Sequence, residues 1–386
     1  MKKKIVILGS TGSIGKTTIS LIKKEKKNFE IKLLSTNKKI DTLINQAKEF
    51  KVKNLIITDH DKFLYAKNRY REFKFYNTFS IIDSIFKDKQ VDYVMNSIIG
   101  LDGLEPTLQI IPKTKYIAIV NKEALICGWN LIKKKLTQFK TKFIPIDSEH
   151  FSIFSLIKNK KKSSINKIYI TASGGPFLNY KIKNLENISV KEAIKHPSWK
   201  MGKKISIDSS TMMNKVFEIV EAKKIFNLSY KKIDILTHPM SYIHAIIKFN
   251  NGTIKLLAHE TDMKIPIFNS IYLESFKQFP LKNLDLVKLN NLNLKKVDKK
   301  KFPFLKIIDL LPEKDSLFEV ALVVINDFFV NKFIIKEISY NKMVDLILEK
   351  INSKQILLLR QKSVRDLVNI HDLRNELSLK LRQNYI

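Results

Sequence analysis

The sequence predicts an α/β protein with a doubly wound parallel sheet at its N-terminal end, an α+β domain in the middle and a small helical bundle at its C-terminal end. Over residues 1–147, short apolar runs alternate with helical patterns, which is typical of a parallel sheet covered by helices. Further on, two strand-like runs flank the turn Asn250-Asn251-Gly252, which predicts a β-hairpin. From Phe302 onward the apolar spacing is helical and no strand signals interrupt it.

The first strand, residues 4–8, runs into the glycine loop G-S-T-G-S-I-G at 9–15 and then into a helix. In this context each glycine has a distinct task in binding a dinucleotide. Gly9 permits the tight turn, Gly12 lets the backbone approach a pyrophosphate, and Gly15 lets the helix pack closely on the strand. The loop predicts a Rossmann-like nucleotide site, and the alternative is a plain tight turn.

The second strand, residues 29–34, is followed by a polar run without an acidic residue. An NAD site places Asp or Glu here to hold the ribose 2′-hydroxyl. The residues present suit a 2′-phosphate instead, so the sequence favours NADPH; they are Ser35, Thr36, Asn37, Lys38 and Lys39.

The alternation continues with strands at 55–58, 91–96, 116–120 and 143–146. Ligands of such sheets bind at the carboxyl ends of the strands. Asn121, Lys122 and Glu123 follow one strand there, and Asp147-Ser148-Glu149-His150 follows the next. Two carboxylates around a serine suit Mg²⁺ or Mn²⁺. The alternative is that Asp147 or Ser148 caps the next helix.

The middle of the chain begins with a strand at 168–172 and the loop S-G-G-P-F at 173–177. Ser173 and the glycines suit an oxyanion, or form a simple turn. Residues 178–204 are polar and predict a mobile loop in which Trp199 is either a lid or an ordinary anchor. The histidines of the following strands lack the spacing of metal ligands and are expected in the sheet or core; they are His238, His244 and His259.

The stretch from His196 to Glu221 is where we place the chemistry. Ser209 or Ser210 is expected to cap a helix whose free N–H groups would face an anion. On that helix Asn214 and Glu218 share a face, with Lys215 one step round. This pattern suits a phosphorylated substrate at one end and a metal at the other. The alternative is a capped amphipathic surface helix.

The composition excludes several other classes of protein. No run of about 18 apolar residues occurs, so a membrane span is not expected. A single cysteine, Cys127, excludes an intramolecular disulfide and a Cys-rich zinc site. The net charge of +33 is spread along the chain, and only six of the 70 basic residues are Arg. A specific nucleic-acid site with clustered Arg is therefore not expected, and a cytoplasmic location is the default.

These motifs together resemble the 1-deoxy-D-xylulose 5-phosphate reductoisomerase family. The resemblance runs from the glycine loop through N-K-E at 121–123, D-S-E-H at 147–150 and S-G-G-P-F at 173–177. It continues through 196–215 and E-x-x-E at 218–221, and covers about the first 275 residues in order. It implies isomerisation and reduction of the phosphorylated sugar 1-deoxy-D-xylulose 5-phosphate to 2-C-methyl-D-erythritol 4-phosphate, with NADPH and one Mg²⁺ or Mn²⁺, by a homodimer.

The resemblance also implies a role for each matching residue. The metal ligands would be Asp147, Glu149 and Glu218, which together with Lys122 make up the expected catalytic set. The substrate would contact Lys122, Ser148, Glu149, Ser173, His196, Trp199, Met201, Ser209, Asn214, Lys215 and Glu218. The cofactor would contact Thr11, Gly12, Ser13, Ile14, Asn37, Lys38, Lys39, Asn121, Glu123 and Gly202. The expected domains are 1–147 for NADPH, 148–276 for catalysis and dimerisation, a linker at 277–301 and a helical domain at 302–386.

The chain departs from the family pattern at Asn37, Lys39 and Val216 and in V-V-I-N-D at 323–327. None of these departures removes an expected metal ligand or phosphate contact, so the sequence predicts an active enzyme. The nearest rival is a conventional NADPH oxidoreductase such as a semialdehyde dehydrogenase. That chemistry needs a nucleophilic Cys or a His-based acid, and Cys127 has no paired histidine nearby in the sequence.

Overall fold

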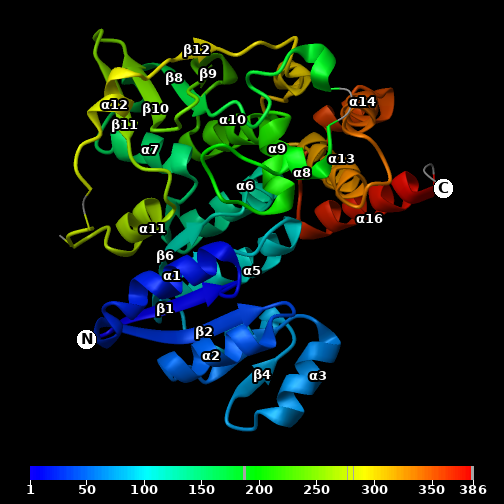
Figure 1. Ribbon diagram of the computed structural model, residues 1–386. Helices are drawn as coiled ribbons and strands as arrows, with labels where there is room; N and C mark the ends of the chain where they lie inside the picture. The colour runs from blue at the N-terminus through cyan, green and yellow to red at the C-terminus, as the bar shows by residue number, and fades with distance from the viewer. Residues whose placement is uncertain (186–187, 276, 281, 384–386) are drawn as a thin grey trace. The chain divides into compact units, whose positions relative to one another are not determined.

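The computed structural model describes residues 1–185, 188–275, 277–280 and 282–383, and the chain divides into two compact units (Figure 1). The first unit comprises Met1–Leu125, Asn130–Phe151 and Met263–Leu281. The second comprises Ile126–Trp129, Ser152–Asp262 and Lys282–Ile386.

The first unit is built on a seven-stranded parallel sheet of order β4-β3-β2-β1-β5-β6-β7. Its strands are β1 (Lys3–Leu8), β2 (Phe29–Thr36), β3 (Asn54–Ile57), β4 (Lys74–Tyr76), β5 (Val91–Asn96), β6 (Thr114–Ile119) and β7 (Lys142–Pro145). Its helices are α1 (Ser13–Lys23), α2 (Ile40–Phe50), α3 (His60–Arg69), α4 (Ile82–Ile85), α5 (Leu104–Ile110), α6 (Lys122–Gln138) and α11 (Lys264–Ile271). The residues Ile126–Trp129 of α6 are assigned to the second unit.

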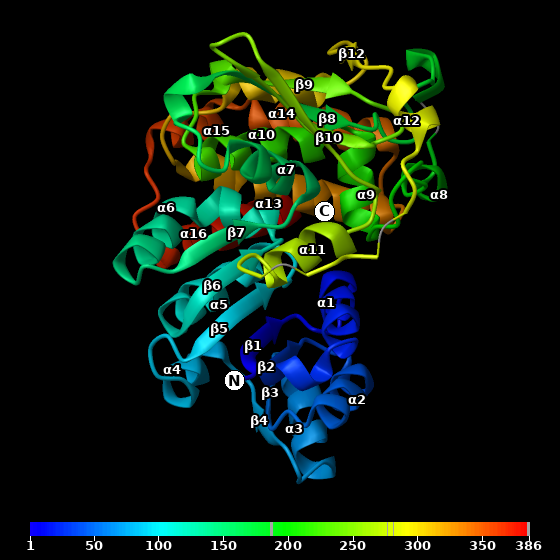
Figure 2. The ribbon, with the colours of Figure 1, turned by 90° about the vertical axis from the view of Figure 1, so that its left-hand side faces the viewer.

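Helices cover both faces of this sheet, because its strands are apolar on both faces. Ile5 and Ile7 of β1 lie in one core with residues of α1, α2 and α11. Val6 and Leu8, which point to the opposite face, are also fully buried. Figure 2 shows α1 and α2 on one side of the strands and α4 and α5 on the other.

The second unit holds a five-stranded mixed sheet of order β11-β10-β8-β9-β12. Its strands are β8 (Ile165–Ala172), β9 (Ile233–Thr237), β10 (Ile243–Phe249), β11 (Ile254–Ala258) and β12 (Lys295–Lys296). Its helices are α7 (Ser148–Ile157), whose first four residues fall in the first unit, α8 (Val190–Ala193), α9 (Lys203–Ser210), α10 (Met213–Phe226), α12 (Leu286–Asn290), α13 (Leu317–Ile334), α14 (Tyr340–Ile351), α15 (Lys354–Leu358) and α16 (Leu367–Gln383).

The C-terminal helices pack around α13, which contacts α14, α16 and α9. Most of α13 is buried, including Phe318, Val320 and Phe329, as expected for a helix that is apolar on all sides. Over the part of the chain that the structure describes, no helix is long and apolar enough to cross a membrane.

The predicted fold class is confirmed, and the structure adds detail that the sequence did not give. The three-residue edge strand β4 was not predicted. The segment Met263–Leu281 belongs to the first unit, because α11 buries Ile267 and Ile271 in the core of that unit. The expected linker at 277–301 contains α12 and β12, and β12 pairs with β9.

Candidate active site

The glycine loop has the geometry that its sequence predicts. Gly9 has φ +76°, and a side chain there would meet the Ser97 carbonyl at 3.0 Å. A Cβ on Gly15 would lie 2.4 Å from the Gly9 oxygen, so only glycine lets α1 start this close to β1. Gly12 is the N-cap of α1 and carries no side-chain cap. The first N–H groups of this helix, from Ser13 and Ile14 onward, therefore point at the loop.

The end of β2 lies against this loop. Ser35 Oγ accepts a hydrogen bond from the Gly9 N–H at 2.8 Å, and Thr11 Oγ1 lies 2.6 Å from Thr36 Oγ1. Lys38 is 68% exposed and its Nζ lies 3.5 Å from Asp59 Oδ2. A surface ion pair of this kind is worth at most about 1 kcal/mol, so it leaves the Lys38 ammonium able to turn toward an anion.

The two neighbours of Lys38 have local structural contacts. Asn37 Nδ2 donates to Thr58 Oγ1 at 2.9 Å. Lys39 is the N-cap residue of α2, and its carbonyl accepts from the Leu43 N–H at 3.2 Å.

Asn121 organises the loop at the end of β6. Its Oδ1 accepts from the Ala124 N–H at 2.9 Å, which caps α6, and its Nδ2 donates to the Ile98 carbonyl at 2.6 Å and to the Gly100 carbonyl. Both amide hydrogens are therefore used within the protein. The neighbouring Lys122 and Glu123 are buried.

The carboxyl ends of β6 and β7 bring Lys122 and Asp147 together, because these strands are parallel neighbours. Lys122 Nζ forms an ion pair with Asp147 Oδ2, and His150 Nδ1 lies 3.3 Å from Asp147 Oδ1. Burial by itself would raise the pKa of Asp147, but the Lys122 ammonium and the His150 ring hold it well below its usual range. The carboxylate is thus ionised at neutral pH.

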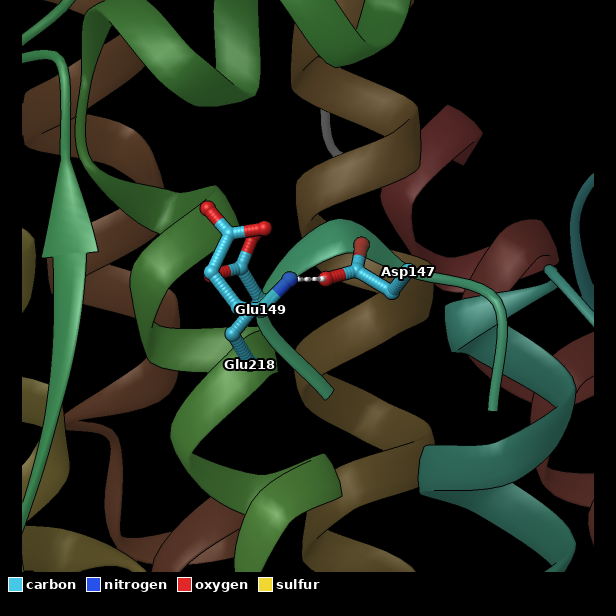
Figure 3. Close-up of side chains that lie close together, drawn as sticks. All are labelled: Asp147, Glu149 and Glu218. Atoms are coloured by element: carbon cyan, nitrogen blue, oxygen red, sulfur yellow. Dashed lines mark hydrogen bonds between the residues drawn. The ribbon is translucent and has the colours of Figure 1, made fainter. Parts of the chain in front are cut away.

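Asp147 also caps the helix α7, which was the alternative interpretation of the acidic sequence at 147–150. The Glu149 N–H donates to Asp147 Oδ1 at 3.3 Å (Figure 3), and the Phe151 N–H donates to the Asp147 carbonyl at 2.7 Å. Ser148 Oγ donates to Glu149 Oε2. Capping and ligand chemistry are compatible, since a carboxylate has about four acceptor sites.

Ser173, His196 and Trp199 form a chain of hydrogen bonds in the second unit. The His196 Nδ1 accepts from the Ser198 N–H at 3.1 Å and from the Trp199 N–H at 2.9 Å. The proton of the neutral ring is therefore on Nε2, which lies 2.9 Å from Ser173 Oγ and donates to it. Ser173 Oγ also accepts from the Gly175 N–H at 3.1 Å. Its own hydroxyl proton remains available to an external acceptor.

Burial, with a smaller effect of the Lys215 charge, lowers the pKa of His196 to about 4. The ring is accordingly neutral at pH 7, in agreement with its hydrogen bonds. Trp199 is half-buried, and its indole lies edge-on to the His244 ring with centroids 6.1 Å apart. In this structure Trp199 is therefore held at both its backbone and its ring. Met201 is half-buried, and the exposed Gly202 is the N-cap of α9.

The predicted helix cap at Ser209 or Ser210 is wrong. Both residues lie in the last turn of α9, and the chain then breaks at Met212, which has φ +64° and precedes α10. Met212 is the N-cap residue and makes no side-chain cap hydrogen bond, and Thr211 Oγ1 accepts from the Met213 N–H at 3.3 Å. The helix α10 thus begins at Met213, three or two residues later than a cap at Ser209 or Ser210 would place it.

The Ser173 loop packs directly on the end of α9. A Cβ on Gly175 would lie 2.8 Å from the Ser209 carbonyl and 3.0 Å from the Ser210 Cα. Gly175 also has φ +65°, so both space and backbone conformation require glycine there. This close contact places the segments that carry Ser173 and Ser209 side by side.

The first turns of α10 carry the predicted polar face. Asn214 Nδ2 donates to Glu218 Oε1 and Lys215 Nζ donates to Glu218 Oε2, each at 2.5 Å. The side chains of Lys215 and Glu218 are only 8% and 1% exposed. The predicted i, i+4 pairing of Asn214 with Glu218 is confirmed, and the alternative of a surface helix is wrong.

The three carboxylates predicted as metal ligands form a close group. One carboxylate oxygen from each of Asp147, Glu149 and Glu218 lies within 4.8 Å of the other two (Figure 3). An all-oxygen, acidic donor set of this size fits a hard divalent cation such as Mg²⁺ or Mn²⁺.

Sequence reasoning missed the buried contacts that hold α9 and α10 on the C-terminal helices. Asn326 Nδ2 donates to Asp208 Oδ1 at 2.8 Å, which ties α9 to α13. Lys224, at the far end of α10, lies 2.7 Å from Asp315 and 3.0 Å from Glu319, and its side chain is 3% exposed. These contacts fix the two helices that carry Ser209, Asn214, Lys215 and Glu218.

Comparison with known proteins identifies the family. The family model described as 1-deoxy-D-xylulose 5-phosphate reductoisomerase matches residues 5–128, and its two C-terminal domain models match residues 143–226 and 259–376. A curated reductoisomerase of Pelagibacter ubique is 53% identical over 382 residues, covering 98% of both chains. The chain belongs to the 1-deoxy-D-xylulose 5-phosphate reductoisomerase family. A reductoisomerase of Sulfurihydrogenibium is 36% identical, covering 99% of both chains.

Solved structures of reductoisomerases share the whole architecture. The Zymomonas mobilis reductoisomerase in complex with NADPH has a TM-score of 0.88 at 26% identity, covering 100% of this chain and 99% of the other. A reductoisomerase in complex with NADPH, fosmidomycin and magnesium has a TM-score of 0.88 at 30% identity, covering 99% and 97%. The family resemblance seen in the sequence is confirmed, and the helical C-terminal region, where the motifs were sparse, belongs to the same fold.

Proposed function

We infer that the protein converts 1-deoxy-D-xylulose 5-phosphate to 2-C-methyl-D-erythritol 4-phosphate with NADPH and one divalent cation. The observation that carries this inference is the close group of Asp147, Glu149 and Glu218, in a chain 53% identical to a named reductoisomerase. Glu218 shares its hydrogen bonds with Asn214 and Lys215. On α10, the proposed metal ligand Glu218 thus adjoins Asn214 and Lys215, the proposed phosphate contacts.

The metal would be held by Asp147, Glu149 and Glu218. When bound, a divalent ion polarises the keto and adjacent hydroxyl oxygens and lowers the pKa of that hydroxyl. The arrangement of the carboxylates supports this assignment, because Asp147 is kept ionised by Lys122 and His150 and Glu218 is paired with Lys215. Asp147 is therefore ready to ligate a metal without first losing a proton.

The phosphate end of the substrate would bind Ser173, Ser209, Asn214 and Lys215, with His196 behind Ser173. Ser173 Oγ has accepted two hydrogen bonds from the protein, so its proton can only be donated outward. Lys215 supplies the charge and the start of α10 supplies the positive end of a 14-residue helix. Binding energy from this remote group positions the reacting carbons.

The rearrangement would take place beside Lys122, Ser148 and Glu149. Deprotonation of the C3 hydroxyl lets the C3–C4 bond break while C4 joins C2, which leaves an aldehyde at C3. Lys122 and Ser148 are both buried, so they would hold the substrate oxygens in place of water. Glu149, which accepts a hydrogen bond from the Ser148 hydroxyl, would pass protons to and from those oxygens. Trp199 and Met201 would cover the sugar.

Hydride from NADPH would then reduce the aldehyde. The pyrophosphate would lie on Thr11, Gly12, Ser13 and Ile14 at the start of α1, and the 2′-phosphate would lie near Lys38. Asn121, Glu123 and Gly202 complete the proposed cofactor contacts, together with Asn37 and Lys39. Asn121 would make its contact through Oδ1 or its backbone, because its amide hydrogens are already used.

We also propose the division of labour among domains, with residues 1–147 binding NADPH, 148–276 performing the chemistry and forming the dimer, and 302–386 supporting α9 and α10. A cytoplasmic location belongs to this proposal. The homodimer is supported by β11, an edge strand that exposes Ile254 at 63% and Leu256 at 44%. An exposed apolar edge strand can pair with a strand of another chain. In a two-fold dimer, the partner would supply its own β11 for this pairing.

The test is to incubate the protein with NADPH, Mn²⁺ and 1-deoxy-D-xylulose 5-phosphate and to analyse the product by ¹H NMR. Oxidation of NADPH is followed at 340 nm. The rearranged product has its methyl group on a quaternary carbon, which gives a singlet. Direct reduction of the ketone would give a product of the same mass whose methyl group is a doublet. A doublet would support a conventional oxidoreductase and refute the proposed function.

A further inference from the structure

We propose that His259 is a positioning residue for the reaction, because it stacks on His244 and so forms a rigid platform on which Trp199 docks. This inference rests on the proposed function, in which Trp199 covers the substrate. The two imidazoles are stacked with centroids 3.8 Å apart and planes 20° apart, and Trp199 meets His244 at 6.1 Å and 63°. The latter geometry is the favourable edge-to-face arrangement of aromatic rings.

The pairing of β10 with β11 determines where the imidazoles of His244 and His259 lie. The pairing of β10 with β11 shifts between Ile243 and Ala245, so that His244 is the extra residue of a β-bulge. Bulges re-aim a side chain out of the regular alternation. His259 follows the last residue of β11, and its N–H donates to the Tyr242 carbonyl at 3.0 Å, which extends the pairing past the bulge. The two rings are therefore brought together by the backbone of the hairpin.

Backbone carbonyls also fix the orientation of each ring. His244 Nε2 lies 3.1 Å from the His259 carbonyl, and His259 Nδ1 lies 2.7 Å from the Glu260 carbonyl. A carbonyl only accepts, so both ring nitrogens are the protonated ones. The rings are buried, with 1% and 8% of their surface exposed, and neither is free to rotate without losing a hydrogen bond.

Trp199 is thereby held at two points. Its backbone N–H donates to His196, which in turn donates to Ser173, and its indole lies on the histidine pair. Trp199 thus links Ser173, the proposed phosphate contact, to the β10–β11 hairpin that carries His244 and His259. Loss of the platform would leave the backbone contact in place but free the indole to change rotamer.

The test compares three variants of the full-length protein. His259→Leu has a similar volume but removes the stacked plane, whereas His259→Phe keeps the plane and loses the Nδ1 hydrogen bond. His60→Leu is the matched control, because His60 is an exposed histidine of the first unit. We expect His259→Leu to raise KM for the sugar phosphate about two- to tenfold, with NADPH affinity unchanged. His259→Phe and His60→Leu should stay within twofold of the parent.

A fluorescence measurement tests the platform without substrate. In a Trp129→Phe background Trp199 is the sole tryptophan. In this background, His259→Leu should shift the emission of Trp199 to longer wavelength and lower its anisotropy. His259→Phe should change neither quantity. Unchanged emission and unchanged KM in a folded His259→Leu variant would overturn the proposal.

The same measurements separate this proposal from the function on which it rests. If the parent fails to turn over the sugar phosphate, the proposed function fails, and the emission still decides whether the platform exists. Should His259→Leu not fold, His259→Asn replaces it, because its amide keeps a donor toward the Glu260 carbonyl without a ring. The same shift in emission is expected, and its absence would contradict the platform.

Discussion

Lys215 is expected to bind the substrate phosphate and to balance the charge of Glu218, and Lys215→Met separates these two effects. The lysine Nζ lies 2.5 Å from Glu218 Oε2, and the two side chains are 8% and 1% exposed. Breaking a buried ion pair from one side costs about 3–5 kcal/mol. Asn214 still donates to the other carboxylate oxygen, so the free energy of unfolding should fall by about 3 kcal/mol.

A divalent cation should offset much of that loss, because it supplies the positive charge that Glu218 has lost. Urea unfolding of Lys215→Met with and without saturating Mn²⁺ measures this recovery. Lys203→Met is the matched control, since Lys203 is an exposed lysine at the start of α9 and its loss changes the net charge equally. The control should lose less than about 0.5 kcal/mol.

The phosphate contact is measured by kinetics. A charge-assisted contact contributes about 1.5–3 kcal/mol, so Lys215→Met should lower kcat/KM for 1-deoxy-D-xylulose 5-phosphate about ten- to a hundredfold. The sugar without its phosphate should be affected far less. An equal loss for both sugars, or a variant as stable as the parent in the absence of metal, would refute this account of Lys215.

Two further predictions concern the cofactor and the neutral histidine. Lys38→Asp should erode the preference for NADPH over NADH through the affinity for NADPH, and an unchanged ratio of kcat/KM for the two cofactors would remove Lys38 from the 2′-phosphate site. His196 should titrate with a pKa of about 4 in ¹⁵N NMR, with its proton on Nε2 at pH 7. Since this pKa lies below the unfolded value of about 6.5, the unfolded chain takes up the proton first. The contribution of His196 to stability should therefore be lost as the pH falls from 6.5 to 4, and a pKa above 6 would contradict the hydrogen bonds described.

Local rules made part of the candidate active site predictable. Gly9 is required by its positive φ angle, and Gly15 is required by the close contact between α1 and the glycine loop. The strand-glycine-helix pattern of the sequence predicts both requirements. The pairing of Asn214 with Glu218 follows from the helical period alone. Lys122 and Asp147 were each predicted to follow a strand of the parallel sheet, and these two strands are neighbours in the structure.

Other features depend on packing that no local pattern encodes. The helix break at Met212 was missed because a methionine rarely adopts φ +64°, and the serines before it look like caps. Lys224 cannot be singled out among so many lysines, although it is buried against two carboxylates. The bulge that brings His244 onto His259 depends on the register of β10 against β11. The spacing of the histidines in the sequence therefore does not predict their stacking.

Metal binding by the three carboxylates is the central claim, and isothermal titration with Mn²⁺ tests it most directly. The parent should bind one ion per chain, whereas Asp147→Asn and Glu218→Gln should bind it at least tenfold more weakly and lose turnover. NADPH binding by the same two variants serves as the control for folding and should be unchanged. If both variants bind Mn²⁺ like the parent and still convert the sugar phosphate, Asp147 and Glu218 are not ligands of a catalytic metal.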